Sequence, residues 1–151
     1  MELIPIENEA FRGDPSCQEI GEMTVDYYKK IGFVPPWIGY FAKQNGNFVG
    51  SAAFKGPPVN GVVEIAYITF EPYRKQGIGA AICKKLVELS LETAPSVKIT
   101  ARTLPENNFS TRILEKNNFS FIGTVDDPDD GPVWEWEFQS IAMEESTLEK
   151  L

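Results

Sequence analysis

Residues 73–81 read Tyr-Arg-Lys-Gln-Gly-Ile-Gly-Ala-Ala, and this stretch decides how the rest of the chain is interpreted. It lies between an apolar run and an amphipathic run, so the pattern predicts a strand, a glycine-containing turn and a helix. Gly77 and Gly79 have no Cβ, and the backbone can therefore bend sharply and approach an anion closely. The first turn of a helix presents N–H groups without intrahelical partners, and Arg74 and Lys75 add formal charge beside them. The stretch predicts a binding site for a pyrophosphate group.

Composition narrows the class of protein. The chain has 151 residues, a net charge of −8, two cysteines and no histidine. We expect one domain over residues 1–151, no membrane segment, no nucleic-acid partner and no metal site, with a reduced cytoplasmic setting. The absence of histidine from the sequence excludes Ser-His-Asp triads and histidine general bases.

Periodicity and turn signals predict ten elements, in the order strand, helix, three strands, helix, strand, helix, two strands. A capping box at Ser16 begins the first helix and Gly32 ends it. Asn45-Gly46 predicts a tight hairpin. The order indicates an α/β protein of the α+β type with a mixed sheet rather than a series of βαβ units. The sequence leaves residues 143–151 open as a short helix or a frayed end.

Two segments carry a family resemblance. Arg74-x-x-Gly77-x-Gly79-Ala80 resembles the pyrophosphate loop of GNAT-superfamily N-acetyltransferases, and residues 105–119 resemble their second cofactor segment. Val63-Glu64-Ile65-Ala66-Tyr67 resembles the preceding strand in the branch that includes ribosomal-protein and small-molecule acetyltransferases. The resemblance covers about residues 36–139. Asn118 stands where the family usually has glycine, and asparagine tolerates the left-handed conformation that ends a helix there.

The resemblance implies a GNAT-like fold with a mostly antiparallel, twisted sheet of about seven strands flanked by three to four helices. It implies acetyl-CoA as co-substrate, a small-molecule or peptide amine as acceptor, and compatibility with a homodimer. The strand before the loop would offer backbone N–H groups to the thioester. The implied cofactor-binding residues are Ile68, Thr69, Phe70, Arg74, Lys75, Gln76, Gly77, Ile78, Gly79, Ala80 and Asn107.

Acetyl transfer to an amine requires the amine to lose a proton, and a carboxylate can accept that proton directly or through water. A lysine amine has a pKa near 10.4 and an α-amine one near 8, so the α-amine needs less help. Glu64 is the candidate base, because a carboxylate in an otherwise apolar strand is costly unless it has a purpose or faces solvent. The simpler interpretation, a solvent-facing glutamate on an alternating strand, stays open.

The leaving thiolate needs a proton or a positive dipole. Many GNAT relatives use a tyrosine on the second helix, and the matching position here is Leu114, which cannot donate. Ser110 is the candidate substitute, although a hydroxyl at a helix start also serves as a cap. Asn107 would bind the pantetheine arm or cap the same helix. A third interpretation needs no side-chain acid.

Three other functions are alternatives to acetyl transfer: dinucleotide binding, nucleotide binding by a Walker loop, and non-catalytic binding of acetyl-CoA. A dinucleotide-binding turn would need a third small residue and an early βαβ unit, and a Walker loop would need Gly-Lys-Ser/Thr; the sequence has neither. A non-catalytic acetyl-CoA-binding module is the serious alternative, and Leu114 is its best support. The sequence does not identify the acceptor, the acyl-chain preference or the oligomeric state.

Overall fold

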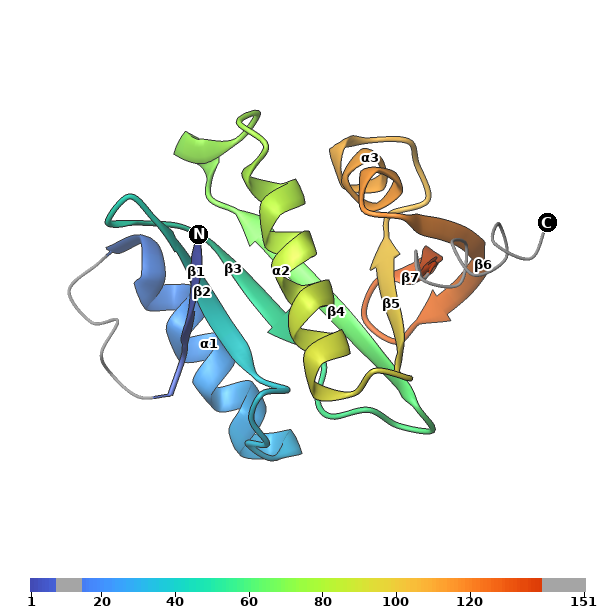
Figure 1. Cartoon of the computed structure of the whole chain (residues 1–151), viewed down its shortest axis with the longest axis horizontal. Helices are drawn as coiled ribbons and strands as arrows, with labels where there is room; N and C mark the ends of the chain where they lie inside the picture. The colour runs from blue at the N-terminus through green and yellow to red at the C-terminus, as the bar shows by residue number, and fades with distance from the viewer. Residues whose placement is uncertain (8–14, 140–151) are drawn as a thin grey trace. The chain divides into compact units, whose positions relative to one another are not determined.

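The computed structural model describes residues 1–7 and 15–139, which form ten α and β elements in the predicted order (Figure 1). The chain divides into two compact units, residues 1–99 and 100–151. The predicted ending at 143–151 lies outside the described residues. Each unit is built from antiparallel strand pairs and helices, and the described residues contain seven strands and three α-helices. The predicted α/β class and strand number are therefore confirmed.

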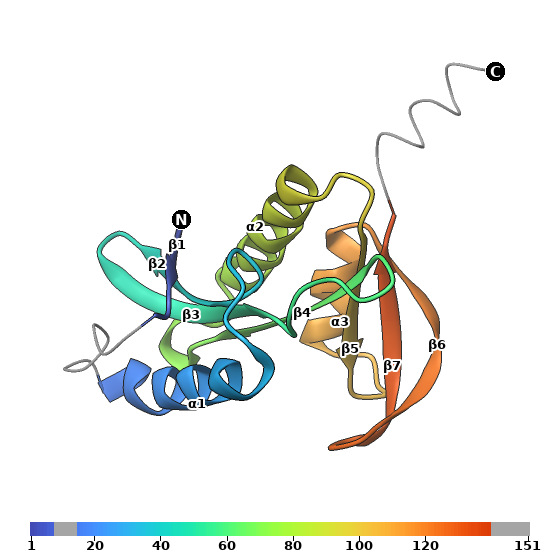
Figure 2. The same ribbon diagram turned by 90° about the horizontal axis from the view of Figure 1, so that it is seen from below.

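Unit 1 is a four-stranded antiparallel sheet between two helices. The strands are β1 (Glu2–Pro5), β2 (Gly39–Gln44), β3 (Asn47–Phe54) and β4 (Val62–Thr69), which lie in the order β1-β2-β3-β4. Figure 2 shows α1 (Pro15–Ile31) and α2 (Ile78–Thr93) on opposite faces of this sheet. Each face of the sheet therefore has its own helix.

Residues with restricted or unusual backbone conformations explain the turn of the β2–β3 hairpin and the start of α1. Asn45 and Gly46 have φ values of 52° and 80°, so both central residues adopt the left-handed conformation that a two-residue turn requires, as predicted. The helix α1 begins at Pro15 rather than after a cap at Ser16, so the predicted cap position is wrong. Proline suits the first helical position because it lacks a backbone N–H, and an N–H at that position would have no intrahelical partner.

Apolar side chains on both sides of the sheet fix its position. Fully buried side chains include Ile65 on β4 and Ile82 and Leu86 on α2. A second cluster joins Ile6, Cys17, Phe41 and Phe70, with Tyr73 packed against it. The second cluster ties the segment that follows β4 to α1 and β2, and it anchors the turn at residues 73–81.

Unit 2 pairs its strands in the order β5-β7-β6 and carries one helix. The elements are β5 (Lys98–Thr103), α3 (Phe109–Lys116), β6 (Phe119–Asp127) and β7 (Gly131–Phe138). Residues 100–103 of β5 pair antiparallel with β7, and β6 pairs with β7 through a bulge between Phe121 and Gly123. Buried Trp136 donates its indole N–H to Thr103 Oγ1 at 3.0 Å, which ties β7 to β5.

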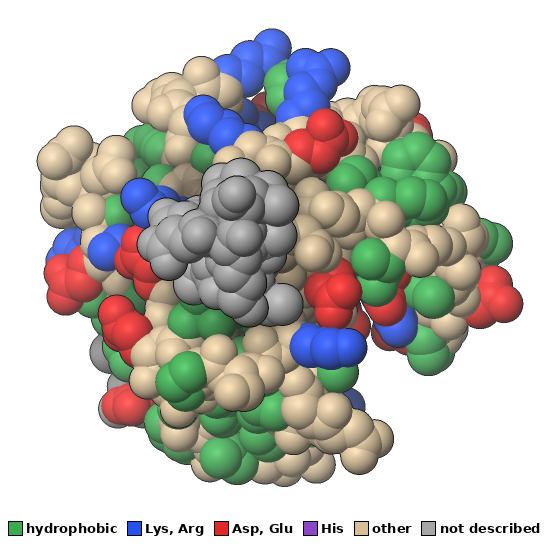
Figure 3. Space-filling model, turned by 45° about the vertical axis from the view of Figure 1, so that its right-hand side comes forward, with side chains coloured by type: hydrophobic (Ala, Val, Ile, Leu, Met, Phe, Trp, Pro, Cys, Tyr) green, Lys and Arg blue, Asp and Glu red, His purple; other side chains and the backbone are tan. Residues whose placement is uncertain are grey.

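The surface carries charged side chains of both signs (Figure 3). Acidic and basic side chains are both spread over the face in Figure 3, so the net charge of −8 does not come from a uniformly acidic surface there. Of the helices that the structure describes, none combines the length and apolar character that a membrane span requires.

Candidate functional site

The turn after β4 is built as an anion site would be. A 3₁₀ turn at Glu71–Tyr73 is followed by Lys75 with φ 65° and Gly77 with φ 77°, and Gly77 is the N-cap residue of α2. No side chain caps the first turn of α2. The amides of Ile78 and Gly79 belong to this first turn, where N–H groups have no partner inside the helix. The predicted loop therefore has the geometry in which main-chain donors and the helix dipole meet an anion.

Arg74 is held at the root of this turn. Its Nε donates to the carbonyl oxygen of Thr69 at 3.3 Å, while Gln76 Nε2 lies 3.5 Å from the carbonyl oxygen of Pro72. The Arg74 and Gln76 side chains are exposed, as is that of Lys75. The guanidinium is thus positioned by main chain and keeps its remaining N–H donors for another partner.

Backbone amides along β4 point alternately toward β3 and away from it. This alternation distinguishes the three residues whose N–H groups were predicted to bind the thioester, Ile68, Thr69 and Phe70. The Phe70 amide donates to Val49 O at 2.9 Å, and the Lys55 amide donates to Glu64 O at 2.9 Å. These two bonds fix which β4 amides point at β3, since antiparallel pairs alternate between bonded and non-bonded. The amides of Ile68 and Phe70 point at β3, whereas the Thr69 amide points to the other edge. The Ile68 and Phe70 amides are therefore directed at β3, and of the three candidate donors only the Thr69 amide points away from β3.

The register of the sheet assigns each β4 side chain to a face. A Cβ on Gly50 would lie 2.8 Å from Ile82 Cδ1 of α2, and Gly50 pairs with Thr69. Directly paired residues share a face, and the faces alternate along a strand. Odd-numbered β4 residues therefore face α2, and even-numbered residues face the α1 side. Consistently, a Cβ on Gly39 would meet α1, and Gly39 pairs with Ala53.

The two faces of β4 differ in burial. On the α2 side, Val63 and Ile65 are each 2% exposed. On the α1 side, Glu64 and Ala66 are partly exposed and Ile68 is 51% exposed. The paired β3 residues on the α1 side, Ser51 and Ala53, are small and partly exposed. We call these five residues the β3–β4 strip: Ser51, Ala53, Glu64, Ala66 and Ile68.

Glu64 stands at one end of the β3–β4 strip and is ion-paired. Its Oε2 lies 3.4 Å from Nζ of Lys55, the residue opposite it just beyond β3, and the two side chains are 20% and 49% exposed. At about 3.4 Å per residue, Glu64 and Ile68 are about 14 Å apart along the strand. The carboxylate is therefore accessible from solvent and lies on the same open surface as the Ile68 end of the strand. Sequence reasoning missed Lys55, because no local signal pairs residues across a loop.

In unit 2 the start of α3 is occupied by its own side chains. Asn108 Oδ1 accepts from the Thr111 amide at 3.2 Å, and the Asn108 amide donates to Thr111 Oγ1 at 3.0 Å. Asn108 is the N-cap of α3. The interpretation that Asn107 or Ser110 caps this helix is therefore wrong, since Asn107 precedes the cap and Ser110 lies inside the helix. Asn107 and Ser110 are both exposed. They lie in unit 2, whereas Glu64, the β4 donors and residues 74–80 lie in unit 1.

Two other unit 2 residues behave as expected from their chemistry. Leu114 is 1% exposed and packs into the interior of unit 2. Asn118 follows α3 with φ 68°, which is the left-handed conformation predicted for this asparagine.

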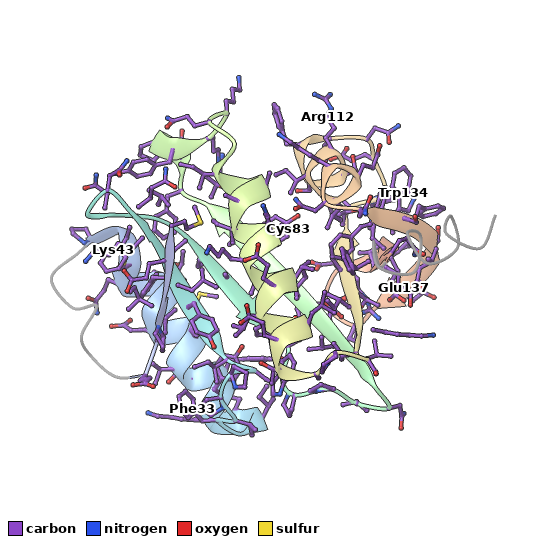
Figure 4. The ribbon with its side chains drawn as sticks, viewed as in Figure 1. Phe33, Lys43, Cys83, Arg112, Trp134 and Glu137 are labelled. Atoms are coloured by element: carbon purple, nitrogen blue, oxygen red, sulfur yellow. The ribbon has the colours of Figure 1, made fainter. Side chains whose placement is uncertain are left out.

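Cys83 of α2, labelled in Figure 4, is fully buried beside Tyr67 of β4. Burial raises the pKa of the Cys83 thiol to about 12, and burial likewise raises the pKa of Tyr67. The thiol therefore stays protonated near neutral pH, and a thiol in that form is a poor nucleophile. Among the residues of 1–7 and 15–139, no group of three or more acidic, cysteine or histidine side chains is arranged to hold a metal ion.

A second charged cluster, in unit 2, was not predicted. Arg102 donates through Nη1 to Asp127 at 3.0 Å and through Nε to Glu135 at 3.2 Å. Asp127 also accepts from the amides of Asp129 and Asp130 in the β6–β7 turn. These hydrogen bonds lower the pKa of Asp127, the backbone bond from Asp129 most and the Arg102 side chain next. The cluster links three strands of unit 2 through residues that are far apart in sequence.

Comparison with known proteins agrees with this geometry. The acetyltransferase (GNAT) domain family matches residues 10–120. No curated protein matches the chain. A crystal structure of aminoglycoside acetyltransferase AAC(6')-Ib with coenzyme A is 28% identical, with a TM-score of 0.61 over 73% of this chain and 70% of that one.

Two less similar structures share the fold. A chimera of spermidine N-acetyltransferase SpeG from Vibrio cholerae and hSSAT is 15% identical, with a TM-score of 0.67 over 91% of this chain and 95% of that one. IAA acetyltransferase from Bacillus cereus is 18% identical, with a TM-score of 0.64 over 92% and 97%. The family match spans most of the chain and includes the turn after β4, and the chain therefore belongs to the GNAT acetyltransferase family.

Proposed function

We propose that the chain moves an acetyl group from acetyl-CoA to a primary amine by direct attack in a ternary complex. The observation that carries this proposal is the first turn of α2, which no side chain caps and which follows Gly77 in the left-handed conformation. Side-chain caps normally satisfy such a turn, and an anion fills the same role. Family membership makes coenzyme A the anion to consider first.

Residues 74–80 hold the diphosphate in this proposal: Arg74, Lys75 and Gln76 by side chain, and Gly77, Ile78, Gly79 and Ala80 around the main chain of the turn. Acetyl-CoA supplies the activated acetyl group as a thioester. The Thr69 amide, turned away from β3, donates to the thioester oxygen. The family resemblance alone assigns Asn107 and Ser110 to the pantetheine arm. Charge that develops on the oxygen is stabilised by a donor already in place.

Glu64 accepts the proton of the acceptor amine, directly or through one water. Its partly exposed carboxylate on the β3–β4 strip supports this role. The protonated, buried thiol of Cys83 supports transfer without a covalent enzyme intermediate. Ser110 is the proposed proton source for the leaving thiolate, since Leu114 carries no exchangeable proton and is buried.

The acceptor is proposed to be a cationic amine. The chain carries a net charge of −8, which favours cations through its overall field. The similar structure AAC(6')-Ib, at 28% identity, was crystallised with kanamycin, and this supports an amine of that class as acceptor. SpeG, named for spermidine, shares only the fold and supports the acceptor class less.

Thiol release from acetyl-CoA, measured against a panel of amines, tests the proposal. The panel contains an aminoglycoside, a polyamine, a peptide with a free N-terminus and a small monoamine. We expect release above the no-amine background for at least one cationic amine, with the acetylated amine identified by mass. Thermal stabilisation by acetyl-CoA without release for any amine would instead indicate a non-catalytic binding module.

A further inference from the structure

The Lys55–Glu64 pair is the starting point, and the inference drawn from it rests on the proposed function. Lys55 presents an ammonium group 3.4 Å from the Glu64 carboxylate on the α1 side of the sheet. An amine acceptor with a pKa well above 7 also arrives as an ammonium ion. The chain therefore places, beside its candidate base, the same chemical group that the acceptor would bring.

The pair is easy to break. Lys55 is exposed and its side chain has four rotatable bonds, so it loses little by returning to water. Ion pairs of this exposure contribute about 0–1 kcal/mol. A ligand ammonium that meets Glu64 can therefore displace Lys55, whereas a buried pair would resist displacement.

The surroundings favour a ligand on this side. The other members of the β3–β4 strip next to Glu64 are small or partly exposed, and the α2 side of the same strand is filled by Val63 and Ile65. A ligand lying along the strip would meet Ala53 and Ala66 before it reaches Glu64. Small side chains leave room for it close to the sheet.

We propose that Lys55 is a built-in competitor of the acceptor, with its ammonium group occupying the place beside Glu64 where the ammonium group of a cationic acceptor binds. Lys55 thus sets how tightly acceptors bind beside Glu64, without discriminating among the acceptors that pair with it. It raises the KM of every acceptor that pairs with Glu64 by one common factor, and it leaves the KM of acetyl-CoA unchanged. A side chain tethered this close has an effective concentration of about millimolar or more.

The kinetic test compares Lys55→Met, Lys55→Arg and Lys85→Met with the unaltered chain, using the best acceptor of the panel. Lys85 is an exposed lysine on α2, at the other face of the sheet, so its replacement changes net charge equally without touching Glu64. We expect Lys55→Met to lower the acceptor KM about two- to fivefold, as displacement of an exposed pair implies. Lys55→Arg and Lys85→Met should stay near the original KM.

A double-mutant cycle separates competition from a general charge effect. In a Glu64→Gln background, Lys55→Met should leave the acceptor KM unchanged, because the carboxylate for which the two cations compete is gone. An equal fall in KM with and without Glu64, or an unchanged KM in Lys55→Met alone, overturns the proposal while the proposed acetyl transfer stands.

Calorimetry with spermidine in the presence of coenzyme A gives a readout without turnover. Lys55→Met should bind spermidine about two- to fivefold more tightly than the unaltered chain. Equal binding by the two proteins, or no binding by either, overturns the proposal. If no amine supports thiol release, the proposed function fails, and this titration still decides whether Lys55 competes for a cation.

Discussion

Helices α2 and α3 both begin near the predicted cofactor segments, but their N-termini are capped differently. The first turn of α3 is closed by a reciprocal pair of hydrogen bonds between Asn108 and Thr111. The first turn of α2 follows a left-handed glycine and has no side-chain cap. Both helices face the same physical requirement, since first-turn amides need acceptors. The chain supplies the acceptor for α3 from its own side chains, and at α2 we propose that a ligand anion supplies it.

The difference supports the proposal that the diphosphate binds at α2 and not at α3. Both N-termini carry the same partial charge from the helix dipole, so the dipole alone does not distinguish them. The side-chain cap does, because a capped terminus has fewer donors to offer. Adjacent cations add to the contrast, as Arg74 and Lys75 lie directly before α2.

The largest effect should come from filling the α2 turn. Gly79 is buried in that turn, and Gly79→Leu places a side chain where the anion approaches. We expect the Kd of coenzyme A to rise at least about 100-fold, which corresponds to roughly 2.7 kcal/mol. Titration calorimetry measures this loss. Lys84→Leu, the same side chain on the exposed surface of α2, should keep its affinity, and circular dichroism of both variants shows whether the fold persists.

A smaller effect on turnover is expected from Glu64→Gln, which keeps the shape of the side chain and removes its ability to accept a proton. We expect kcat to fall about 100-fold, the lower end of what a positioned base contributes. The Kd of coenzyme A should stay within about twofold, because Glu64 is remote from residues 74–80. Steady-state rates across pH provide the check. An unchanged pH profile would remove Glu64 from the mechanism.

Removing the side-chain cap of α3 should lower the free energy of unfolding and leave cofactor affinity nearly unchanged. Asn108→Ala removes the cap of α3 and should lower the free energy of unfolding by about 1 kcal/mol. Because the first turn of α3 is already capped by its own side chains, the Kd of coenzyme A should change far less than in Gly79→Leu. Chemical denaturation and calorimetry on the same preparation give both numbers. A loss of coenzyme A affinity as large as that of Gly79→Leu would erase the distinction between the two termini.

The smallest effect concerns the charged cluster of unit 2. Asp127 has a lowered pKa in the folded chain, so its contribution to stability is present above the ordinary value of 3.8 and is lost as pH falls through the folded value. Asp127→Asn should therefore be less stable than the unaltered chain at pH 7. The two should converge below about pH 3.8. Thermal melting at a series of pH values measures the gap, and a gap that widens toward acid would contradict the assignment.

Local signals predicted most of the fold. The Asn45-Gly46 turn, the start of α2 at the glycine stretch and the left-handed Asn118 each depend on backbone conformations that few residues adopt, and all three are confirmed. The start of α1 was wrong because Pro15 can occupy the first helical position as readily as it can precede a cap.

The conformation of the candidate site was predicted only where one contiguous segment of the chain forms it. Residues 74–80 are contiguous, so their spacing alone indicates an anion-binding turn. The sequence did not distinguish the Thr69 amide from those of Ile68 and Phe70, because the direction of each amide depends on the register with β3, which the sequence does not specify. Lys55 beside Glu64, and Arg102 between Asp127 and Glu135, are contacts across strands, and single-sequence patterns do not encode such partners.

The most direct test of this account is a crystal structure of the chain with coenzyme A. We expect diphosphate oxygens within about 3.2 Å of the main-chain nitrogens of Ile78 and Gly79, with the Arg74 side chain beside them. Coenzyme A whose diphosphate lies at the capped start of α3, or that leaves the start of α2 without an anion, would contradict it.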